Sequence, residues 1–491
     1  MDWETEYKRK LVSAEEAVKI VKSGDLVMLP LPSQPAILQN ALAARVAELK
    51  NVRLLASAPA FNPGWWSPGM EDSFSTMIEV FIGAQARSAM DEKRTDYLPD
   101  LFSLRFKGLD ENRPEGRGKE IDVLMTPLSP PDKHGFCSFG HTMWNKRSYA
   151  KRAKQVIAEI DENAIRTYGT NYIHISEVDY FVEPEVGPEF SVEEWQEMCQ
   201  IFFKKGPEEV RAKLRRYPPF ALRQILNICK IVGGDFVAPH VGLDEPTEAA
   251  IDISHYLGEI INDGDTFQVG VGRPSSFMVK LGVFDNKVDL GIHTEMGCPG
   301  LPLLVREGVA TGKYKTLHPA KAVFSTFMGC DADDIDYVAD NPAFEQYDTE
   351  YVANIRTVAQ HDNMVAINNS LQVDLTGQIC SETQFGPRMI NGQGGQTETH
   401  IGALLARGGR AITLLPSTAI GGSVSTIVPQ LEKGSLVTIP RQFADIIVTE
   451  YGVARLLDKS HRERAEELIA IAHPDFRAEL RKEAQTLFYP Q

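Results

Sequence analysis

The sequence has no run of about 20 apolar residues, so it predicts no membrane-spanning helix. Its opening segment, MDWETEYKRK, lacks the apolar centre that a secretory signal needs. Positive charge is also scarce, because 67 acidic residues outnumber 51 lysines and arginines and give a formal net charge of -16. This balance is atypical of proteins that bind nucleic acids or anionic membranes. We therefore expect a cytoplasmic protein that binds neither nucleic acid nor membrane.

Cysteine and histidine are too few and too scattered to suggest a metal centre or a disulfide framework. The chain has 6 cysteines and 11 histidines in 491 residues. No two cysteines form a CxxC pair, and the sequence contains neither an HExxH motif nor a His/Cys cluster. The sequence therefore predicts a reduced protein without a bound metal.

Short apolar runs alternate with amphipathic helical segments through most of the chain. A chain of 491 residues is too long for one ordinary core, so we expect two domains. Strands that alternate with helices are typical of α/β proteins with mainly parallel sheets. The runs that read as strands are DLVMLPL, VRLLAS, IDVLMTPL and QVIAEI in the first part, and DTFQVGV, VDLGIH, MVAINN, AITLLP and ADIIVTE later.

A weak internal repeat indicates that the two domains are similar. The segments SAEEAVKIVKSGDLVMLPLPSQPAILQNAL and EAAIDISHYLGEIINDGDTFQVGVGRPSSFMVKL each contain a helix, a Gly-Asp turn, a strand and a second helix, in that order. Gly24-Asp25 of the first copy matches Gly264-Asp265 of the second, and Pro35 falls near Pro274. We interpret this shared order as an internal duplication.

A helix-rich segment separates the two copies. It contains SVEEWQEMCQIFFKKGPEEVRAKLRRYPPFALRQILNICKIV, which Pro218-Pro219 divides in two. We therefore predict an N-terminal α/β domain over residues 1–186, a helical connector over residues 187–242 and a C-terminal α/β domain over residues 243–491.

The segment LGIHTEMGCPG ends a buried-looking strand in three polar residues, His293, Thr294 and Glu295. The glycines and the proline that follow prevent a regular continuation. Open α/β sheets place their sites at the carboxyl ends of strands, where Glu295 could act as a nucleophile, a general base or a metal ligand. The alternative is a surface glutamate that caps the next helix, and this segment alone leaves both interpretations open.

A glycine-rich loop enters a predicted helix in NGQGGQTETHIGALLARGGR. The backbone N–H groups of Gly394 and Gly395 can approach a ligand closely because no side chain blocks them. The helix that follows adds the positive end of its dipole and ends at Gly408. The loop suits a phosphate or a developing oxyanion, although it is neither GxGxxG nor a Walker loop. A flexible turn is the alternative.

Further strand ends carry polar or main-chain groups. In QVGVGRPSSF, Val271 and Gly272 can offer main-chain donors, although a plain strand-helix turn is the simpler interpretation. Asn368 follows an apolar run and has both donor and acceptor groups on its side chain. Glu450 ends another apolar run, where a lone glutamate is more often a helix-cap partner than a catalyst.

Taken together and in order, these motifs resemble the acetyl-CoA hydrolase/transferase family, whose members include acetate- and 4-hydroxybutyrate-type CoA-transferases. The resemblance covers nearly the whole chain outside the helical connector, and it implies a fold of two similar α/β domains. The segments that carry it are SAEEAVKIVKSGD, SPPDKHGFCSFG, GVG, LGIHTEM, TGKYKTLHPAKAVFSTFMG, VAINNSLQVDLTGQICSE, GQGGQ, LLPSTA, SVSTIVP and IVTEYGVARLLDKSHRERAEELIAIAHPDFR.

The resemblance also implies roles for particular residues. Glu295 corresponds to the nucleophilic glutamate, and the amides of Val271 and of Gly394 or Gly395 correspond to an oxyanion hole. Asn368 and Glu450 correspond to polar residues around the acyl group and the glutamate. The implied contacts to CoA come from Gly392, Gly394, Gly395, Gln396, Gly408, Gly409 and Arg410.

The implied activity is transfer of CoA from an acyl-CoA to a carboxylic acid through covalent intermediates on the glutamate. Such an exchange of one thioester for another needs neither a metal nor a redox cofactor, and the resemblance also implies a homodimer or a higher homo-oligomer. An acyl-CoA hydrolase that uses the same glutamate is the nearest alternative, and a CoA-binding protein without activity is a more distant one. Three departures from the family pattern, Gly297-Cys298-Pro299-Gly300, GQTETH and Ser423 in place of a frequent lysine, leave the acid substrate open.

Overall fold

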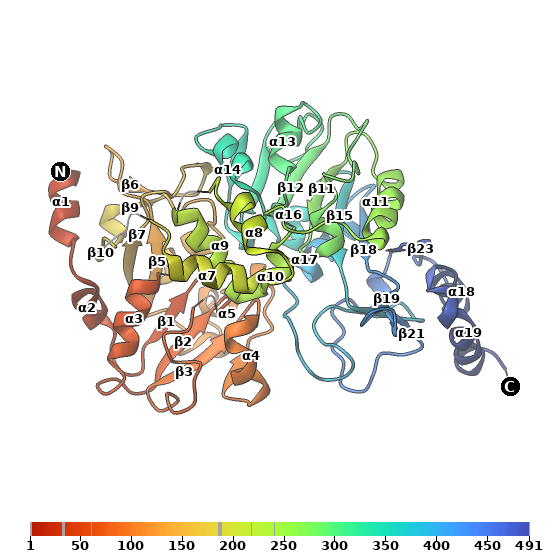
Figure 1. The fold of residues 1–491 in the computed structure, drawn as a ribbon, viewed down its shortest axis with the longest axis horizontal. Coiled ribbons are helices and arrows are strands. Elements are labelled where there is room, and N and C mark those ends of the chain that lie inside the picture. Colours follow the sequence, from red (N-terminus) through yellow and green to blue (C-terminus); the bar gives the residue numbers. More distant parts are fainter. Residues whose placement is uncertain are drawn as a thin grey trace. The chain divides into compact units, whose positions relative to one another are not determined.

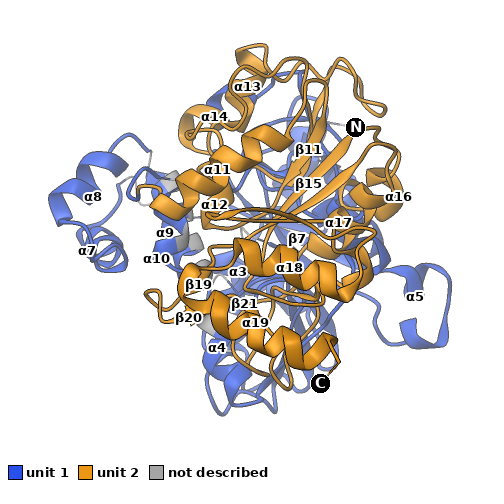
Figure 2. Cartoon of the chain, turned by 90° about the vertical axis from the view of Figure 1, so that its right-hand side faces the viewer, with its two compact units in different colours: residues 1–244, 325–328, 335–351 blue, residues 245–324, 329–334, 352–491 orange. Residues whose placement is uncertain are grey.

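The chain divides into two units, which Figure 2 colours blue and orange. The computed structural model describes residues 2–31, 35–59, 61–184, 189–217, 219–239 and 241–490. Unit 1 comprises residues 1–244, 325–328 and 335–351, and unit 2 comprises residues 245–324, 329–334 and 352–491. The predicted boundary at 186/187 and the proline at 218 lie outside the described residues.

Unit 1 is built on a 7-stranded sheet with the order β10-β7-β5-β1-β2-β3-β4. Every neighbouring pair in it is parallel. Its central strand is buried at each residue, as expected when helices cover both faces of a parallel sheet. The strands are β1 (Leu26–Leu29), β2 (Val52–Ala56), β3 (Phe74–Ile78), β4 (Thr95–Tyr97), β5 (Val123–Leu128), β7 (Gln155–Ile160) and β10 (Tyr180–Val182). Two further pairs of short strands belong to unit 1, namely β6 (Phe136–Cys137) with β9 (Ile173–His174) and β8 (Tyr168–Gly169) with β14 (Phe344–Gln346).

The helices of unit 1 include those of the connector, α7 to α10 (Figure 1). Ser191 begins α7 with a capping box, because its side chain accepts from the N–H of Glu194 and the Glu194 side chain accepts from the N–H of Ser191. The helices are α1 (Trp3–Lys10), α2 (Ala14–Ala17), α3 (Ala36–Ala44), α4 (Gly83–Asp91), α5 (Lys107–Asp110), α6 (Lys146–Arg152), α7 (Val192–Ile201), α8 (Pro207–Leu214), α9 (Pro219–Val232) and α10 (Gly234–Val237).

Unit 2 repeats this plan. Its sheet has the order β23-β22-β18-β15-β11-β12-β13, and β23 is an antiparallel edge strand. The strands from β22 to β12 are parallel to one another. The strands of this sheet are β11 (Thr266–Val269), β12 (Gly291–Met296), β13 (Ala322–Thr326, which crosses a unit boundary), β15 (Met364–Asn369), β18 (Arg410–Leu414), β22 (Ile446–Thr449) and β23 (Gly452–Arg455). One small sheet is formed by β16 (Gln372–Asp374), β17 (Ile379–Cys380) and β21 (Ile427–Val428), and another by β19 (Thr418–Ala419) and β20 (Val424–Ser425).

The helices of unit 2 end in two packed helices at the carboxyl terminus, α18 and α19 (Figure 1). These two helices enclose a core with the strand β22, in which Leu468, Ile447 and Leu480 are buried. The helices are α11 (Glu248–Ile260), α12 (Arg273–Ser276), α13 (Leu301–Arg306), α16 (Ile355–Val358), α17 (Gln396–Leu405), α18 (His461–Ile471) and α19 (Pro474–Phe488), and α14 (Ala332–Val338) and α15 (Thr349–Val352) cross unit boundaries.

The Gly-Asp turns have the same geometry in both units. The carboxylate of Asp25 accepts a hydrogen bond from the backbone N–H of Lys22 at 2.8 Å, and that of Asp265 accepts one from Asn262 at 2.7 Å. In each unit the strand that follows the turn is central, and its neighbours are the next strand of the chain on one side and a later strand on the other. These findings confirm the predicted fold class, two similar α/β units with mainly parallel sheets.

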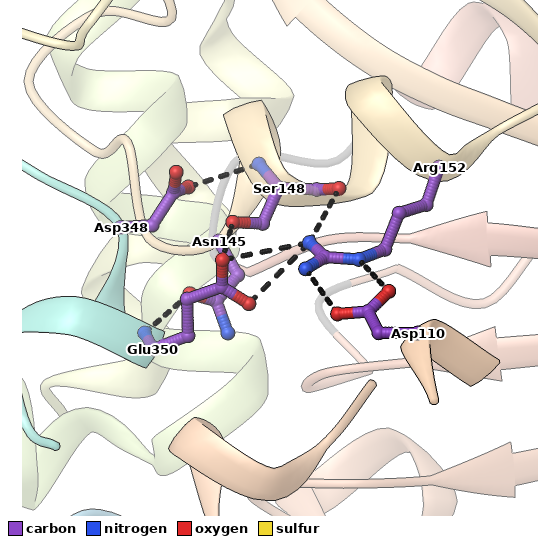
Figure 3. A network of polar contacts seen from close by, with 6 residues as sticks. All are labelled: Asp110, Asn145, Ser148, Arg152, Asp348 and Glu350. Carbon is purple, nitrogen blue, oxygen red and sulfur yellow. Dashed lines mark hydrogen bonds and ion pairs between the residues drawn. The ribbon is translucent and has the colours of Figure 1, made fainter. Parts of the chain in front are cut away.

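A polar network in unit 1 fastens the segment after β14 to α6 (Figure 3). The backbone N–H of Ser148 donates to Asp348 at 3.1 Å, and its hydroxyl donates to Glu350 at 2.6 Å. Arg152 bridges Glu350 and Asp110, with distances of 3.4 and 2.7 Å. Burial raises the pKa of Asp348 to about 7, whereas Arg152 lowers the pKa of Asp110.

These opposite shifts predict opposite pH dependences for two substitutions. Folded Asp348 keeps its proton up to about pH 7, whereas the unfolded chain releases it near the ordinary aspartate pKa of 3.8, so unfolding releases a proton in this window. Because only the unfolded chain ionises Asp348 in this window, the free energy of unfolding falls as pH rises, by at most about 1.4 kcal/mol per pH unit. We expect D348N to gain stability relative to the wild-type protein across this window, measured by urea unfolding at a series of pH values.

The matched variant D110N changes the opposite kind of carboxylate. Because Arg152 stabilises ionised Asp110, D110N should lose a little stability relative to the wild-type protein as pH rises above the unfolded pKa. Parallel curves for D348N and the wild-type protein would contradict the raised pKa of Asp348.

Candidate active site at the strand ends of unit 2

The candidate site lies where neighbouring parallel strands of unit 2 end. The strands β12, β11 and β15 are adjacent in the sheet, so their carboxyl ends share one edge. Glu295 is the next-to-last residue of β12, and Asn368 is the next-to-last residue of β15. The turn Gly270–Gly272 follows β11 directly. Ligands of open parallel sheets bind at this edge.

Asn368 points to the face of the sheet that α16 and α17 cover. Ala366 lies two residues before it on β15, and side chains two residues apart on a strand share a face. Ala366 belongs to a buried cluster with residues of β15, α16 and the α17 segment, namely Met364, Val358, Ala403 and Ala406.

Glu295 points to the same face. His293, two residues before it on β12, lies against His361, which follows α16, with 4.4 Å between the ring centroids. The Nε2 atom of His293 also contacts the carbonyl oxygen of Val352 at 2.9 Å. By the alternation of side chains along a strand, Glu295 extends towards the layer formed by α16 and α17.

Hydrogen bonds connect the strand ends to the start of α17. The side-chain amide of Gln268 donates to Asn368 at 3.3 Å, and the amide of Asn368 donates to the hydroxyl of Thr399 at 3.3 Å. That hydroxyl donates to the carbonyl oxygen of Gly395 at 3.0 Å. All of these side chains are buried. The glycine loop is therefore tied to Asn368 through the first turn of the helix that it precedes.

Main-chain donors are available around this cluster. Among the described residues, none accepts a hydrogen bond from the N–H groups of Val271, Gly394 and Gly395. The side-chain amide of Asn369 donates to the carbonyl oxygen of Gly270 at 3.4 Å, which orients the peptide group that carries the N–H of Val271. Gly394 has φ +55, a left-handed conformation that glycine adopts without strain.

The carboxyl group of Glu295 is almost completely removed from water. The residue is 8% exposed. Burial, followed by the negative charge of Glu398, raises the pKa of Glu295 to about 8. Desolvation disfavours the ionised form because no water stabilises it. Such a group is poorly solvated and therefore reactive once it is ionised, which is typical of functional sites in a crevice.

Glu450 is not brought next to Glu295. It follows β22, and β18, β15 and β11 separate this strand from β12. With strands about 4.8 Å apart, the two strand ends are on the order of 19 Å from each other. The carboxylate of Glu450 instead accepts hydrogen bonds from the hydroxyl and the N–H of Ser417, at 2.5 and 2.9 Å.

Gly408, Gly409 and Arg410 lie at the opposite edge of the sheet. Arg410 is the first residue of β18, so it lies at the amino end of a strand whose carboxyl end faces the candidate site. Its guanidinium forms an ion pair with Asp265, at the start of β11. A strand of 5 residues separates the two edges by roughly 17 Å. The structure thus separates the predicted CoA contacts of this segment from those of Gly392, Gly394, Gly395 and Gln396.

Cys298, close to Glu295 in the sequence, is buried, and burial raises the pKa of its thiol. A thiol of this kind is not a thiolate nucleophile at neutral pH. Within the described ranges, no group of three or more His, Cys, Asp or Glu side chains is arranged to hold a metal ion. In that same part of the chain, no helix is both long and apolar enough to cross a membrane.

Comparison with known proteins decides the family. Residues 1–191 match the acetyl-CoA hydrolase/transferase N-terminal domain, and residues 333–484 match the acetyl-CoA hydrolase/transferase C-terminal domain. The chain belongs to the acetyl-CoA hydrolase/transferase family. The predicted resemblance is thereby confirmed, and so is the prediction of an enzyme of the CoA-transferase class.

Full-length relatives and a solved structure agree with this membership. A 4-hydroxybutyrate coenzyme A transferase of Clostridium kluyveri is 36% identical over 99% of this chain and 100% of its own length. A succinyl-CoA:cyclohexane-1-carboxylate CoA transferase of Geobacter metallireducens is 32% identical over 99% of this chain and 97% of its own. The crystal structure of RipA from Yersinia pestis matches with a TM-score of 0.79 and 30% identity, over 99% of both chains.

Some residues of this acetyl-CoA hydrolase/transferase family member were not predicted from its sequence. Glu398 and Thr399 contribute to the buried polar cluster, and Gln268 joins it from β11. The half-buried Asn369 bonds the turn after β11. The segment GGQTET could have indicated Glu398, because it places a carboxylate three residues after the last glycine of the loop. Asn369 gave no signal, since only the structure reveals that its side chain reaches the turn after β11.

The glycines of that turn are required because β15 passes very close. An alanine Cβ at Gly270 would lie 2.6 Å from Oδ1 of Asn368 and 3.1 Å from the Cα of the same residue. A Cβ at Gly272 would collide with the side chain of Asn369. The GVG motif is therefore explained by the close approach of the end of β15 to the turn after β11, which contains Val271.

We expect G270A to lower turnover at least about tenfold while costing roughly 1–3 kcal/mol of stability, because the new methyl displaces Asn368 and the turn. The measurement is steady-state CoA transfer together with urea unfolding. The control is G206A, where an added Cβ meets nothing within 4 Å. Wild-type turnover in folded G270A would contradict the role given to this close approach.

Proposed function

We propose that the protein exchanges CoA between an acyl-CoA and a carboxylic acid, with Glu295 as the nucleophile that carries each intermediate. The observation that supports this most strongly is the desolvated carboxyl group of Glu295 at the end of β12. The loops of the same unit hold main-chain donors from which no described residue accepts a hydrogen bond. A carboxylate that water does not stabilise is a competent nucleophile towards a thioester.

The first half of the exchange transfers CoA to the enzyme. The carboxylate of Glu295 attacks the thioester carbonyl, the C–S bond breaks, and CoA leaves as a thiolate from a mixed acyl-glutamyl anhydride. The thiolate then attacks the glutamyl carbonyl. The first acid leaves as a carboxylate, and a glutamyl-CoA thioester remains at Glu295.

The second half repeats these steps in reverse with another acid. Its carboxylate attacks the glutamyl thioester, and CoA leaves as a thiolate. The thiolate then attacks the resulting anhydride at the new acyl carbon. The products are the new acyl-CoA and the carboxylate of Glu295. Each acid is bound after the other has left, so the kinetics are ping-pong.

Each attack creates a tetrahedral oxyanion that needs hydrogen-bond donors. The N–H groups of Val271 and of Gly394 or Gly395 serve this purpose, and one well-placed donor is worth roughly 2.7–4 kcal/mol in known oxyanion holes. Asn368 holds the loop through Thr399 and stands near the acyl group. Gly392 and Gln396 contact CoA, and the buried Nε2 of Gln396 has no acceptor in the described part of the chain. Roles for Glu450 and for Gly408, Gly409 and Arg410 remain predictions.

The acceptor is a carboxylic acid, and its side chain is not fixed by the relatives. Their names cover a linear hydroxy acid, a cyclic acid and butyrate. The common element of these substrates is the carboxylate that attacks or leaves, and CoA or acyl-CoA is the other substrate. The cytoplasmic location and the homodimer or higher homo-oligomer remain predictions.

Replacement of the nucleophile tests the covalent route. We expect E295Q to lower kcat at least about 10³-fold, since an amide cannot form either intermediate. The measurement is CoA transfer from butyryl-CoA to acetate, followed by borohydride treatment and peptide mass analysis of the wild-type protein incubated with acyl-CoA. Reduction confined to Glu295 is expected. Full activity of E295Q, or an unmodified Glu295 peptide under conditions of rapid transfer, would overturn the assignment.

Dependence on the acceptor distinguishes transfer from hydrolysis. If water is excluded around Glu295, loss of thioester should require an added carboxylic acid and should stop after one equivalent per site without it. Thioester absorbance with and without acetate measures this directly. Sustained loss of thioester at the same rate without any acid would instead establish an acyl-CoA hydrolase.

A further inference from the structure

A basic pocket opens at the amino edge of the sheet in unit 2. All of its lining residues belong to unit 2, and none of them is acidic, although the chain carries a formal net charge of -16. Cationic side chains that gather in a hollow of an acidic protein create a local positive potential. The pocket has a volume of about 400 Å³ and is lined by Arg441, Gln442, Lys459, Ser460, His461 and Arg464.

The basic pocket lies at the opposite edge of the sheet from Glu295. A short helical turn, η5 (Arg441–Phe443), leads into the start of β22. The antiparallel strand β23 ends at Arg455, which pairs with the first residue of β22. The turn after β23 then leads to Ser460, which caps α18. Because Glu295 lies at the carboxyl edge, the basic pocket is separate from the candidate active site.

Arg464 gives the basic pocket a buried guanidinium. The residue is 8% exposed, and no described carboxylate forms an ion pair with it. Its Nε atom donates to the carbonyl oxygen of Lys459 at 3.1 Å, and its Nη1 atom donates to those of Arg441 and Thr376 at 2.6 and 3.0 Å. Its Nη2 atom donates to no described residue and is not enclosed, so it borders the pocket. Carbonyl oxygens thus hold the side chain in place without neutralising its charge.

Arg441 brings a second positive charge to the basic pocket. The residue is exposed, and within the described ranges its side chain forms neither a hydrogen bond nor an ion pair. Burial, followed by the positive charge of Arg441, lowers the pKa of Arg464, as expected for two cations at close range. Because arginine stays protonated in proteins, these two charges repel each other unless an anion binds between them.

The acidic side chains next to the basic pocket have partners other than the two arginines. Glu467 forms an ion pair with Lys459. Glu463 accepts hydrogen bonds from the N–H and the hydroxyl of Ser460, at 2.8 and 2.7 Å, in the capping box of α18. The positive charges of Arg441 and Arg464 therefore remain available to an anion from solution.

The start of α18 adds main-chain donors to the basic pocket. This helix has 11 residues, and His461 and Arg462 are the first two. No described residue accepts a hydrogen bond from the N–H group of either one. Free N–H groups at the positive end of a helix dipole favour an anion, so they act in the same direction as the two guanidinium groups.

We propose that the basic pocket binds a phosphate group, either as inorganic phosphate or as the phosphate monoester of a small molecule. Arg464 offers Nη2 from a side chain that its carbonyl partners hold in place, and Arg441 closes on the ligand from the solvent side. Guanidinium groups form strong charge-assisted hydrogen bonds with phosphate oxygens, and a dianion balances two positive charges. This binding site does not depend on the proposed CoA transfer.

The test is a calorimetric titration of inorganic phosphate into the wild-type protein and R441Q at constant ionic strength. We expect R441Q to lower the affinity for phosphate at least about tenfold, because a charge-assisted contact is lost. The side chain of Arg441 has no described partner, so R441Q should fold as the wild-type protein does.

The matched control is R407Q. Arg407 is also an exposed arginine at the amino edge of unit 2, two residues before Gly409, but its guanidinium already pairs with Asp362. R407Q should bind phosphate as tightly as the wild-type protein. Equal affinities of R441Q and the wild-type protein would overturn the proposal, and so would a wild-type protein without saturable binding in the millimolar range.

Urea unfolding provides a second readout. A ligand that binds only the folded chain stabilises it, so phosphate should raise the urea midpoint of the wild-type protein more than chloride does at equal ionic strength. Phosphate also stabilises proteins by being excluded from their surface, and this general effect should remain in R441Q. The specific part should be smaller in R441Q. An identical phosphate effect in both proteins would contradict a site at Arg441.

Competition with CoA identifies the source of the phosphate group, because CoA carries a phosphate monoester on its ribose. If saturating CoA prevents the binding of inorganic phosphate and R441Q weakens the binding of CoA, the group belongs to CoA. If phosphate binds equally well beside CoA, the pocket holds a separate phosphate or phosphorylated compound. A protein that binds phosphate but transfers no CoA refutes only the proposed function, whereas CoA transfer without phosphate binding refutes only this site.

Discussion

The site in unit 2 depends on the removal of water from one carboxyl group at the end of a parallel strand. β12 is buried at each residue, and it carries Glu295 into the layer between the sheet and α17. Desolvation is the larger cause of the raised pKa of Glu295, and the charge of Glu398 adds to it. Exclusion of water makes ionisation of this carboxyl costly. It also makes the ionised group reactive, because a nucleophile without a hydration shell gives up less solvation when it attacks.

The internal duplication explains why the two units differ in chemistry despite a common plan. Pairing of Leu26 with Arg53 in unit 1 corresponds to pairing of Thr266 with Gly291 in unit 2, so Ser57 occupies the position equivalent to Glu295. The hydroxyl of Ser57 donates to Glu79 at 2.7 Å. One copy of the fold therefore carries a carboxyl at this strand end, and the other carries a hydroxyl engaged in a structural hydrogen bond.

Much of the fold could be predicted from local patterns. The Gly-Asp turn requires positive φ at the glycine and a short carboxylate cap, so its recurrence at Gly24 and Gly264 revealed the duplication. Glu295 was recognisable because a buried strand stopped at a carboxylate. The glycine loop before α17 was recognisable because such loops expose N–H groups at a helix start.

The parts that sequence did not predict depend on contacts between distant segments. Asn369 holds the turn after β11 only because β15 is the neighbouring strand, an order that no local pattern reveals. Glu398 lies in GQTETH, a segment that departs from the family pattern, but its effect on the pKa of Glu295 depends on the packing of α17 on the sheet. The family resemblance implied a CoA contact for Arg410, yet this residue opens a strand and therefore lies at the amino edge, where it pairs with Asp265.

The central claim is that the carboxyl group of Glu295 is desolvated and holds its proton well above the usual range. The most direct measurement is a carbon-13 NMR titration of side-chain carboxyl-labelled glutamate, with the Glu295 signal identified by its loss in the glutamine variant. Our account predicts a titration of Glu295 near the value of about 8 that its burial and Glu398 impose. A midpoint at the ordinary glutamate value of 4.5 would mean that water reaches this carboxyl, and the account would be contradicted.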